Sequence, residues 1–244
     1  MLNFNPKRIL PDAITCGNLL SGTMAVFMAT QNHFTLAFGF ILLGVFFDFF
    51  DGMSARALGV VNPTGVELDS LADVITSGLA PAMMLCCYLR PVIGWWSLIA
   101  LTMASAAALR LAKFNVDDRQ KSSFIGLATP ANALFWGGIC SMPMAILNWN
   151  AMPWILLAFT LVSDLLMVGE IPFFSLKFHN LSWKENAVAY LFLIGCLILI
   201  AVCVIEAVRY EMIGFACFAG TGCIIWYVVF NLINLALNPK ETQA

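Results

Sequence analysis

The chain has 244 residues, of which 61% are hydrophobic and only 11% are charged, and its formal net charge is −2. Soluble globular domains carry about 25% charged residues, so this composition does not suit a water-facing surface and indicates that lipid is the natural solvent. The chain has no basic run, which argues against a nucleic-acid-binding protein. The length suits a single membrane domain, residues 1–244, rather than two domains.

Eight apolar segments are long enough to cross a bilayer, which takes about 20 helical residues. They predict an all-α integral membrane bundle with transmembrane helices at 12–30, 35–56, 67–89, 92–113, 130–148, 151–170, 187–208 and 212–237. Six of these helices form a core, residues 1–185, and residues 186–244 add two helices and a short polar tail. We expect the first segment to be retained, because it contains polar residues and no small-residue cleavage site follows it cleanly.

The distribution of lysine and arginine predicts the orientation of the bundle. With eight spans both termini share one side of the membrane. Ten cations fall on that side and only two on the other, Arg90 and Arg209. Positively charged loops face the cytoplasm, so both termini and the ends of the second, fourth and sixth helices are expected there, in a multi-pass protein of the cell (inner) membrane.

Four aspartates lie near the cytoplasmic end of the second and third segments. Asp48 and Asp51 are three residues apart, and Asp69 and Asp73 are four apart. On a helix both spacings place the side chains on one face, with about 5–6 Å between Cβ atoms. Two consecutive antiparallel helices can therefore aim two carboxylates each at a shared point.

The charge of these aspartates indicates a metal site. An ionised residue at membrane depth costs roughly 2.5–3.5 kcal/mol on insertion scales, and Arg56 is the one cation nearby in the sequence. Unrelated helix caps would not need two ordered pairs on facing helices. Carboxylate oxygens suit Mg²⁺ or Mn²⁺ rather than zinc. Two such ions about 3.5–4 Å apart can clamp the attacking and leaving oxygens of phosphoryl chemistry.

Small residues surround the aspartates. Gly52, Ala55 and Gly65 leave room for a ligand to approach the backbone, although small residues also serve close packing of membrane helices. Arg56 can contact phosphate oxygens, or it can anchor the end of its helix at the interface.

Residues 48–73 read DFFDGMSARALGVVNPTGVELDSLAD. This segment resembles the signature of the CDP-alcohol phosphotransferase family, DxxDGxxAR followed after eight residues by GxxxDxxxD, and all eight defining positions match. The resemblance implies a membrane enzyme, as a rule a homodimer, that cleaves a CDP-activated substrate and releases CMP.

By the same resemblance, Asp48, Asp51 and Asp69 are metal ligands, and Asp73 is a metal ligand and the general base. Thr15 and Asn18 in the first helix are candidates for nucleotide contact, with hydrogen bonding between helices as the alternative. The residues expected around the CDP moiety are Thr15, Asn18, Gly52, Ala55, Arg56, Gly65 and Asp69.

Other segments are similar to one branch of the family, the membrane-embedded phosphatidylserine synthases. These segments are PDAITCGNLLSG near the N-terminus, RLAKFNV at 110–116, FIGLATPANA at 124–133 and LLMVGEIPFFSLK at 165–177. The departures are Asp12, where asparagine is common, Ala128 in place of proline, Asn132 in place of alanine, and Gly169 and Glu170 in the last segment. The branch implies CDP-diacylglycerol and L-serine as substrates and CMP as a product.

Arg110, Lys113 and Lys177 are candidates for binding the acceptor carboxylate or a lipid phosphate, although the positive-inside rule alone favours cations at these helix ends. Glycerol 3-phosphate or an inositol phosphate would be alternative acceptors. Each brings an extra phosphate and should require more basic residues in the pocket than Arg110 and Lys113 supply. An archaeal ether-lipid donor would look nearly identical in sequence. A cation transporter can also use intramembrane aspartates, but it would not need the family spacing of glycine, alanine and arginine around them.

Overall fold

The structure is a computed structural model of the whole chain, and it describes residue 7 and residues 9–60, 63–117, 124–147, 150–173 and 187–237. Most of this part is helical, which confirms the all-α class. The α-helices are α1 Ile9–Thr30, α2 Phe34–Leu58, α3 Pro63–Asp73, α4 Ala80–Ile93, α5 Thr102–Val116, α6 Thr129–Cys140, α7 Met152–Val168, α8 Ala187–Arg209 and α9 Ile213–Leu237.

Shorter elements join or interrupt these helices. Val74–Leu79 (η2) is π-helical, and Gly94–Leu101 (η3) and Met144–Leu147 (η5) are 3₁₀-helical. Two short strands, β1 Phe124–Ile125 and β2 Pro172–Phe173, pair antiparallel, with Phe124 opposite Phe173. This pair brings the segment that precedes α6 against the segment that follows α7.

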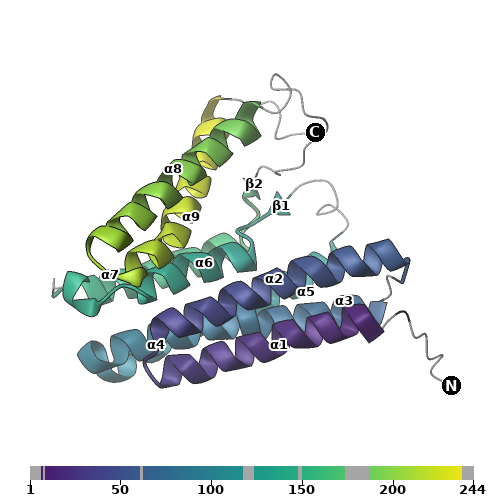
Figure 1. Cartoon of the computed structure of the whole chain (residues 1–244), viewed down its shortest axis with the longest axis horizontal. Coiled ribbons are helices and arrows are strands. Elements are labelled where there is room, and N and C mark those ends of the chain that lie inside the picture. The colour runs from purple at the N-terminus through teal and green to yellow at the C-terminus, as the bar shows by residue number, and fades with distance from the viewer. Residues whose placement is uncertain are drawn as a thin grey trace.

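Five helical stretches of the described chain are long and apolar enough to cross a membrane. They are Ile9–Thr30, Phe34–Leu58, Pro63–Val116, Tyr190–Arg209 and Ile213–Ile233. The long stretch Pro63–Val116 contains two of the predicted spans, because the chain turns back between α4 and α5 (Figure 1). The turn lies at Gly94, whose φ of 56° is a conformation that favours glycine.

The predicted span at 130–148 is shorter in the structure. The helix α6 ends at Cys140, and Pro143 follows, which has no backbone N–H with which to continue a helix. Twelve residues rise about 18 Å, less than the bilayer core of about 30 Å. The helices therefore make a multi-pass membrane protein, and the number of eight spans stays a prediction.

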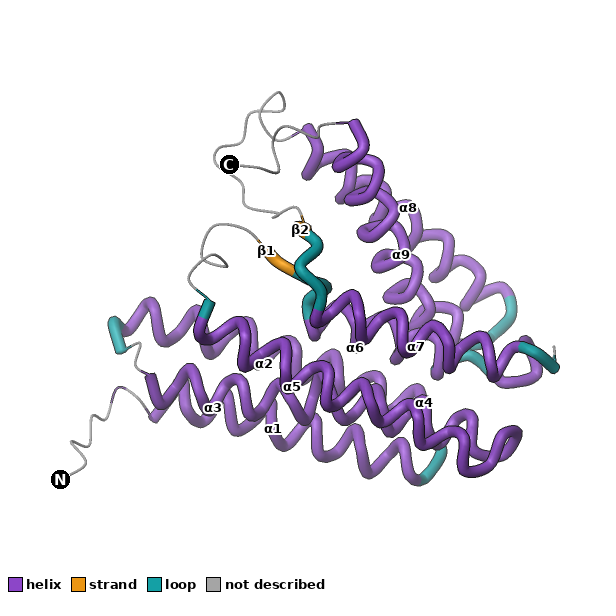
Figure 2. Tube along the Cα trace, turned by 180° about the vertical axis from the view of Figure 1, so that it is seen from behind, coloured by secondary structure: helices purple, strands orange, loops and turns teal. Residues whose placement is uncertain are grey.

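The helices form a bundle with one inclined hairpin. Figure 1 shows α1 and α2 side by side, α6 above them, and the α8–α9 hairpin rising steeply from α6; Figure 2 shows the same arrangement from behind. The core between these helices contains fully buried side chains such as Ile41, Met84 and Trp136. Large apolar side chains also cover the outside: Leu20 is 67% exposed and Leu197 is 65% exposed. An apolar exterior of this extent is the surface that lipid requires.

Small residues bring α1, α2 and η2 into close contact around Thr76. A Cβ atom on Gly22 would lie 2.7 Å from the Thr76 Cα, and one on Gly44 would lie 2.9 Å from the Asn18 Oδ1. The Thr76 hydroxyl donates to the Asn18 carbonyl oxygen at 3.0 Å. These contacts fix the register of α1 against the segment that begins directly after Asp73.

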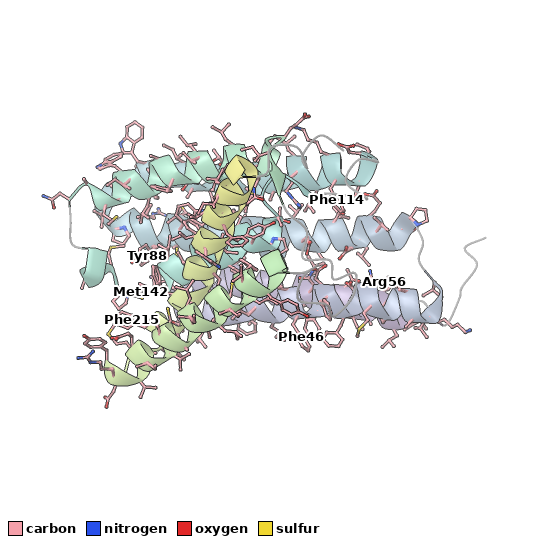
Figure 3. All side chains as sticks on the ribbon, turned by 90° about the horizontal axis from the view of Figure 1, so that it is seen from above. Phe46, Arg56, Tyr88, Phe114, Met142 and Phe215 are labelled. Carbon is pink, nitrogen blue, oxygen red and sulfur yellow. The ribbon has the colours of Figure 1, made fainter. Side chains whose placement is uncertain are left out.

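The two ends of the bundle differ in chemistry. Figure 3 places Arg56 toward one end and Tyr88 and Met142 toward the other. At the Tyr88 end, the Tyr88 hydroxyl of α4 donates to the Met142 carbonyl after α6 at 2.9 Å. The aspartates and their pocket belong to the Arg56 end.

Candidate active site

Three of the four predicted aspartates converge. One carboxylate oxygen from each of Asp48, Asp51 and Asp69 lies within 4.8 Å of the other two. Asp48 and Asp51 come from the last half of α2, and Asp69 comes from α3, so the predicted meeting of two helix faces is confirmed for these three residues. Asp51 is buried, and Asp48 and Asp69 are half-buried.

The acidic cluster has the donor chemistry of a divalent-cation site. Asp51 Oδ2 and Asp69 Oδ1 are buried, and neither has a hydrogen-bond partner among the described residues. Buried carboxylate oxygens without a partner are costly, and a hard cation satisfies them. Oxygen ligands from carboxylates are those that Mg²⁺ and Mn²⁺ prefer, so these three residues fit such an ion.

Asp73 lies beside the cluster and is held by the first helix. It is the last residue of α3, directly before η2, and it is buried. The Asn18 Nδ2 donates to the Asp73 Oδ1 at 3.0 Å, and Asn18 itself is completely buried. A π-helical turn at this position is a frequent feature of functional sites. The part of Asp73 in metal binding stays a prediction, and its orientation by Asn18 is a feature of the structure.

A pocket of about 420 Å³ opens beside the acidic cluster. The sequence predicted seven residues around a CDP moiety, and six of them line this pocket; the exception is Asn18. The lining consists of Pro11, Asp12, Thr15, Asp51, Gly52, Ala55, Arg56, Val60, Gly65, Val66 and Asp69. Residues from α1, α2 and α3 therefore share one cavity with two of the three converging carboxylates.

Gly52 and Arg56 define one wall of the pocket. A Cβ atom on Gly52 would lie 3.5 Å from the Arg56 Nη1, so the guanidinium extends back along α2 over the glycine. Arg56 is exposed, and its five donors suit phosphate oxygens. The absence of a side chain at Gly52 keeps the space in front of this cation open.

The three basic candidates for the acceptor site have different environments. Arg110 is only 6% exposed, its Nη1 donates to the Thr129 Oγ1 at 3.4 Å, and its charge interacts with that of Asp73. Lys113 is exposed, and its Nζ donates to the Val168 carbonyl at 3.2 Å. Lys177 lies outside the described residues. Arg110 is thus the candidate that lies in the interior and whose charge interacts with that of an aspartate.

Asp164 in α7 is not one of the three converging carboxylates and makes a contact between helices. The Thr102 hydroxyl donates to the Asp164 Oδ2 at 2.7 Å, which ties α5 to α7. A second tie joins α5 to α3, because the Asn115 Nδ2 donates to the Ser70 hydroxyl at 3.0 Å. These bonds hold α5, and with it Arg110, against its neighbours.

The apolar bundle and the acidic pocket at one of its ends define a multi-pass membrane protein with a polar site built from its first three helices. A sequence model of the CDP-alcohol phosphatidyltransferase family matches residues 8–166. The chain therefore belongs to this family, and the predicted resemblance is confirmed.

Several curated relatives carry one name, CDP-diacylglycerol–serine O-phosphatidyltransferase. The one from Bacillus subtilis (strain 168) is 38% identical over 173 residues, which is 70% of this chain and 92% of the relative. That of Mycobacterium tuberculosis (strain ATCC 25618 / H37Rv) is 30% identical over 212 residues, 82% of this chain and 71% of the relative. A third, from Methanocaldococcus jannaschii, is 35% identical over 164 residues, 66% of this chain and 76% of the relative.

Proposed function

We propose that the protein transfers the phosphatidyl group of CDP-diacylglycerol to the hydroxyl of L-serine and releases CMP. One observation carries this proposal: six of the residues predicted to surround CDP line a single pocket that opens on the converging carboxylates. The relatives in Bacillus subtilis and Methanocaldococcus jannaschii, whose names specify this donor and this acceptor, support the choice of substrates.

The pocket is suited to the CDP end of the donor. Its volume of about 420 Å³ falls within the range of about 300–1,000 Å³ that is usual for ligand sites. The cytidine lies against Gly52 and Ala55, where the helix backbone is accessible. The diphosphate lies between Arg56 and the acidic cluster, with Thr15 and Gly65 completing the wall.

The acidic cluster holds two divalent cations in this proposal, Mg²⁺ or Mn²⁺. Asp48, Asp51 and Asp69 supply the oxygen ligands, and Asp73 adds a fourth carboxylate. When bound, the cations neutralise the diphosphate and stabilise the oxygen on which CMP leaves. The buried, unpartnered oxygens of Asp51 and Asp69 support this role.

The reaction is a direct displacement at the lipid-linked phosphorus. The serine hydroxyl oxygen forms a bond to that phosphorus, the bond to the CMP oxygen breaks, and CMP takes the bonding electron pair. Asp73 accepts the hydroxyl proton as general base. Asn18 holds the Asp73 carboxylate in one orientation through its 3.0 Å hydrogen bond, which keeps the accepting oxygen directed at the site.

The acceptor lies on the other side of Asp73, toward Arg110. A buried guanidinium is a strong partner for a carboxylate or a phosphate, so Arg110 binds the serine carboxylate or the lipid phosphate. Lys113 and Lys177 extend this basic region toward the cytoplasm. Serine needs one such contact for its carboxylate, whereas glycerol 3-phosphate or an inositol phosphate would bring a further phosphate.

The membrane placement follows from the charge distribution. Ten lysines and arginines on one side against two on the other favour eight spans with both termini and the active site facing the cytoplasm. Serine then arrives from the cytoplasm, and the lipid tails enter from the bilayer of the cell (inner) membrane. The enzyme acts as a homodimer, and a monomer in native mass spectrometry of the purified protein would contradict this part.

One assay separates the candidate functions. Purified protein is supplied with CDP-diacylglycerol and Mg²⁺ or Mn²⁺, and CMP release is measured in parallel with serine, glycerol 3-phosphate and inositol phosphate. Serine alone is expected to support release. Release with one of the phosphorylated acceptors but not with serine would overturn the acceptor, and metal flux into vesicles without CMP release would indicate a transporter.

A further inference from the structure

A second pocket, separate from the acidic cluster, lies between α6, α7 and α9 and has a volume of about 180 Å³. The helix α9 packs against α6, and Figure 1 shows the α8–α9 hairpin meeting α6. Apolar side chains line the pocket except for Asn132 and Ser163. Four lining residues, Phe159, Val162, Ile225 and Val229, are between 42% and 53% exposed. The pocket therefore opens on the apolar outer surface of the bundle, where lipid lies.

The side-chain amide of Asn132 is the unusual feature of this pocket. Asn132 is completely buried, and neither its Nδ2 nor its Oδ1 has a hydrogen-bond partner among the described residues. Ser163 is different, because its hydroxyl donates to the Thr160 carbonyl at 2.9 Å and accepts from the Trp136 Nε1 at 3.1 Å. Buried amides without partners are rare in native proteins. The Asn132 amide therefore has its hydrogen-bonding groups available to a ligand in this pocket.

The depth of Asn132 indicates which ligand group it meets. Asn132 follows Thr129 by three residues on α6, a rise of about 4.5 Å. Thr129 accepts a hydrogen bond from Arg110, the buried cation that suits a phosphate. The helix runs from there toward Ser141, which lines a cavity with Tyr88 and Met142 at the far end of the bundle. Asn132 thus lies one helical turn further into the apolar region than a phosphate at Arg110.

The spacing matches the chemistry of a glycerophospholipid, whose ester carbonyls are separated from the phosphate by the glycerol carbons. A carbonyl oxygen accepts a hydrogen bond from an amide N–H, and the acyl chain beyond it is apolar. An engineered apolar cavity of about 150 Å³ binds benzene, so the volume of this pocket admits roughly six carbons of such a chain.

We propose that this pocket binds one ester-linked acyl chain of a glycerophospholipid, with the Asn132 Nδ2 donating to the ester carbonyl. The lipid is either the CDP-linked donor, in which case the inference rests on the proposed function, or a resident membrane phospholipid. Both sources present the same ester, so the selectivity of the site is for an acyl ester over an alkyl ether.

The first test compares two donors that differ only in this carbonyl, CDP-diacylglycerol and its dialkyl ether analogue. In the full-length protein the KM for the ether is expected to be roughly threefold to tenfold higher than for the ester, the size of one hydrogen bond. Asn132→Ala should remove this difference by weakening binding of the ester. Ser141→Ala, at the other end of α6 and outside the lining of this pocket, should keep it.

The second test uses phosphatidylglycerol and its diether analogue, without CDP, and measures lipid retention by native mass spectrometry and the shift in Tm. Ester preference here, lost in Asn132→Ala and in the volume-conserving Asn132→Leu, supports the site with a resident lipid. Equal responses to ester and ether in wild type and variants, in both tests, would overturn the inference. Absence of CMP release with every donor would instead contradict the proposed function, and the second test alone would then decide.

Discussion

Replacing Gly22 by alanine tests whether the close contact between α1 and η2 holds the active site together. The new Cβ atom would lie 2.7 Å from the Thr76 Cα and 2.9 Å from the Thr76 backbone N. These neighbours are backbone atoms, so the helices must separate. Overpacking of this kind costs about 1–3 kcal/mol. Gly39→Ala on α2 is the matched control, because no atom lies within 4 Å of its new Cβ atom.

Both variants gain the same helix propensity, about 1 kcal/mol, so their difference isolates the steric cost. For a chain of this size, 1 kcal/mol corresponds to about 2–4 °C, and Gly22→Ala should melt roughly 2–12 °C below Gly39→Ala in detergent. The shift also moves Asn18 relative to Asp73, and misplacement by about 1 Å can cost 100-fold in rate. CMP release should fall at least tenfold in Gly22→Ala alone. Equal Tm and equal turnover in the two variants would show that the close contact between α1 and η2 does not hold the active site together.

Three further substitutions test separate parts of the site. Asn18→Ala should lower kcat for CMP release by about 10–100-fold with little change in KM, because Asp73 loses its orienting donor. The control is Thr23→Ala, exposed on the same helix, which should leave kcat unchanged. Full kcat in Asn18→Ala would contradict the role of Asn18. Asp69→Asn should weaken Mn²⁺ binding at least tenfold in calorimetry, because one of three converging carboxylates is lost; unchanged affinity would exclude Asp69 as a ligand. Arg110→Met should reduce kcat/KM at least 30-fold, since removal of a buried ionic partner costs about 2–5 kcal/mol. The control is Arg209→Met, at an exposed position. A loss below threefold in Arg110→Met would mean that the acceptor binds elsewhere.

The acidic cluster could be predicted because its geometry is local. Spacings of three and four residues on a helix fix which side chains share a face, and the two helices follow one another in the chain. For the same reason the small residues around the aspartates could be assigned to one ligand pocket, and Gly52, Ala55, Arg56 and Gly65 do line it.

The orientation of Asp73 could not be predicted, because it depends on how α1 crosses its neighbours. Asn18 and Asp73 are 55 residues apart, and a polar residue in a membrane helix suits a ligand contact as well as a contact between helices. The sequence favoured the nucleotide for Asn18, whereas the structure places it against Asp73 and outside the lining of the pocket beside the acidic cluster. The glycines that let Thr76 approach Asn18 become meaningful only once the crossing is known.

The length of α6 also could not be predicted from the hydropathy pattern. An apolar run at 130–148 predicts one span, but it does not show that α6 stops at Cys140 and that the chain continues as a 3₁₀ turn at Met144–Leu147. Hydropathy measures the environment of a segment and is insensitive to a break within it. The proline at 143 was the available signal for this break.

Asp73→Asn tests most directly the claim that this acidic site transfers the phosphatidyl group. The substitution keeps the shape of the side chain and removes its capacity to accept the serine proton. Serine-dependent CMP release is expected to fall by at least 1,000-fold, on the order of a general base's contribution, while binding of CDP-diacylglycerol stays detectable. Wild-type turnover in Asp73→Asn would contradict the role of Asp73 as the base.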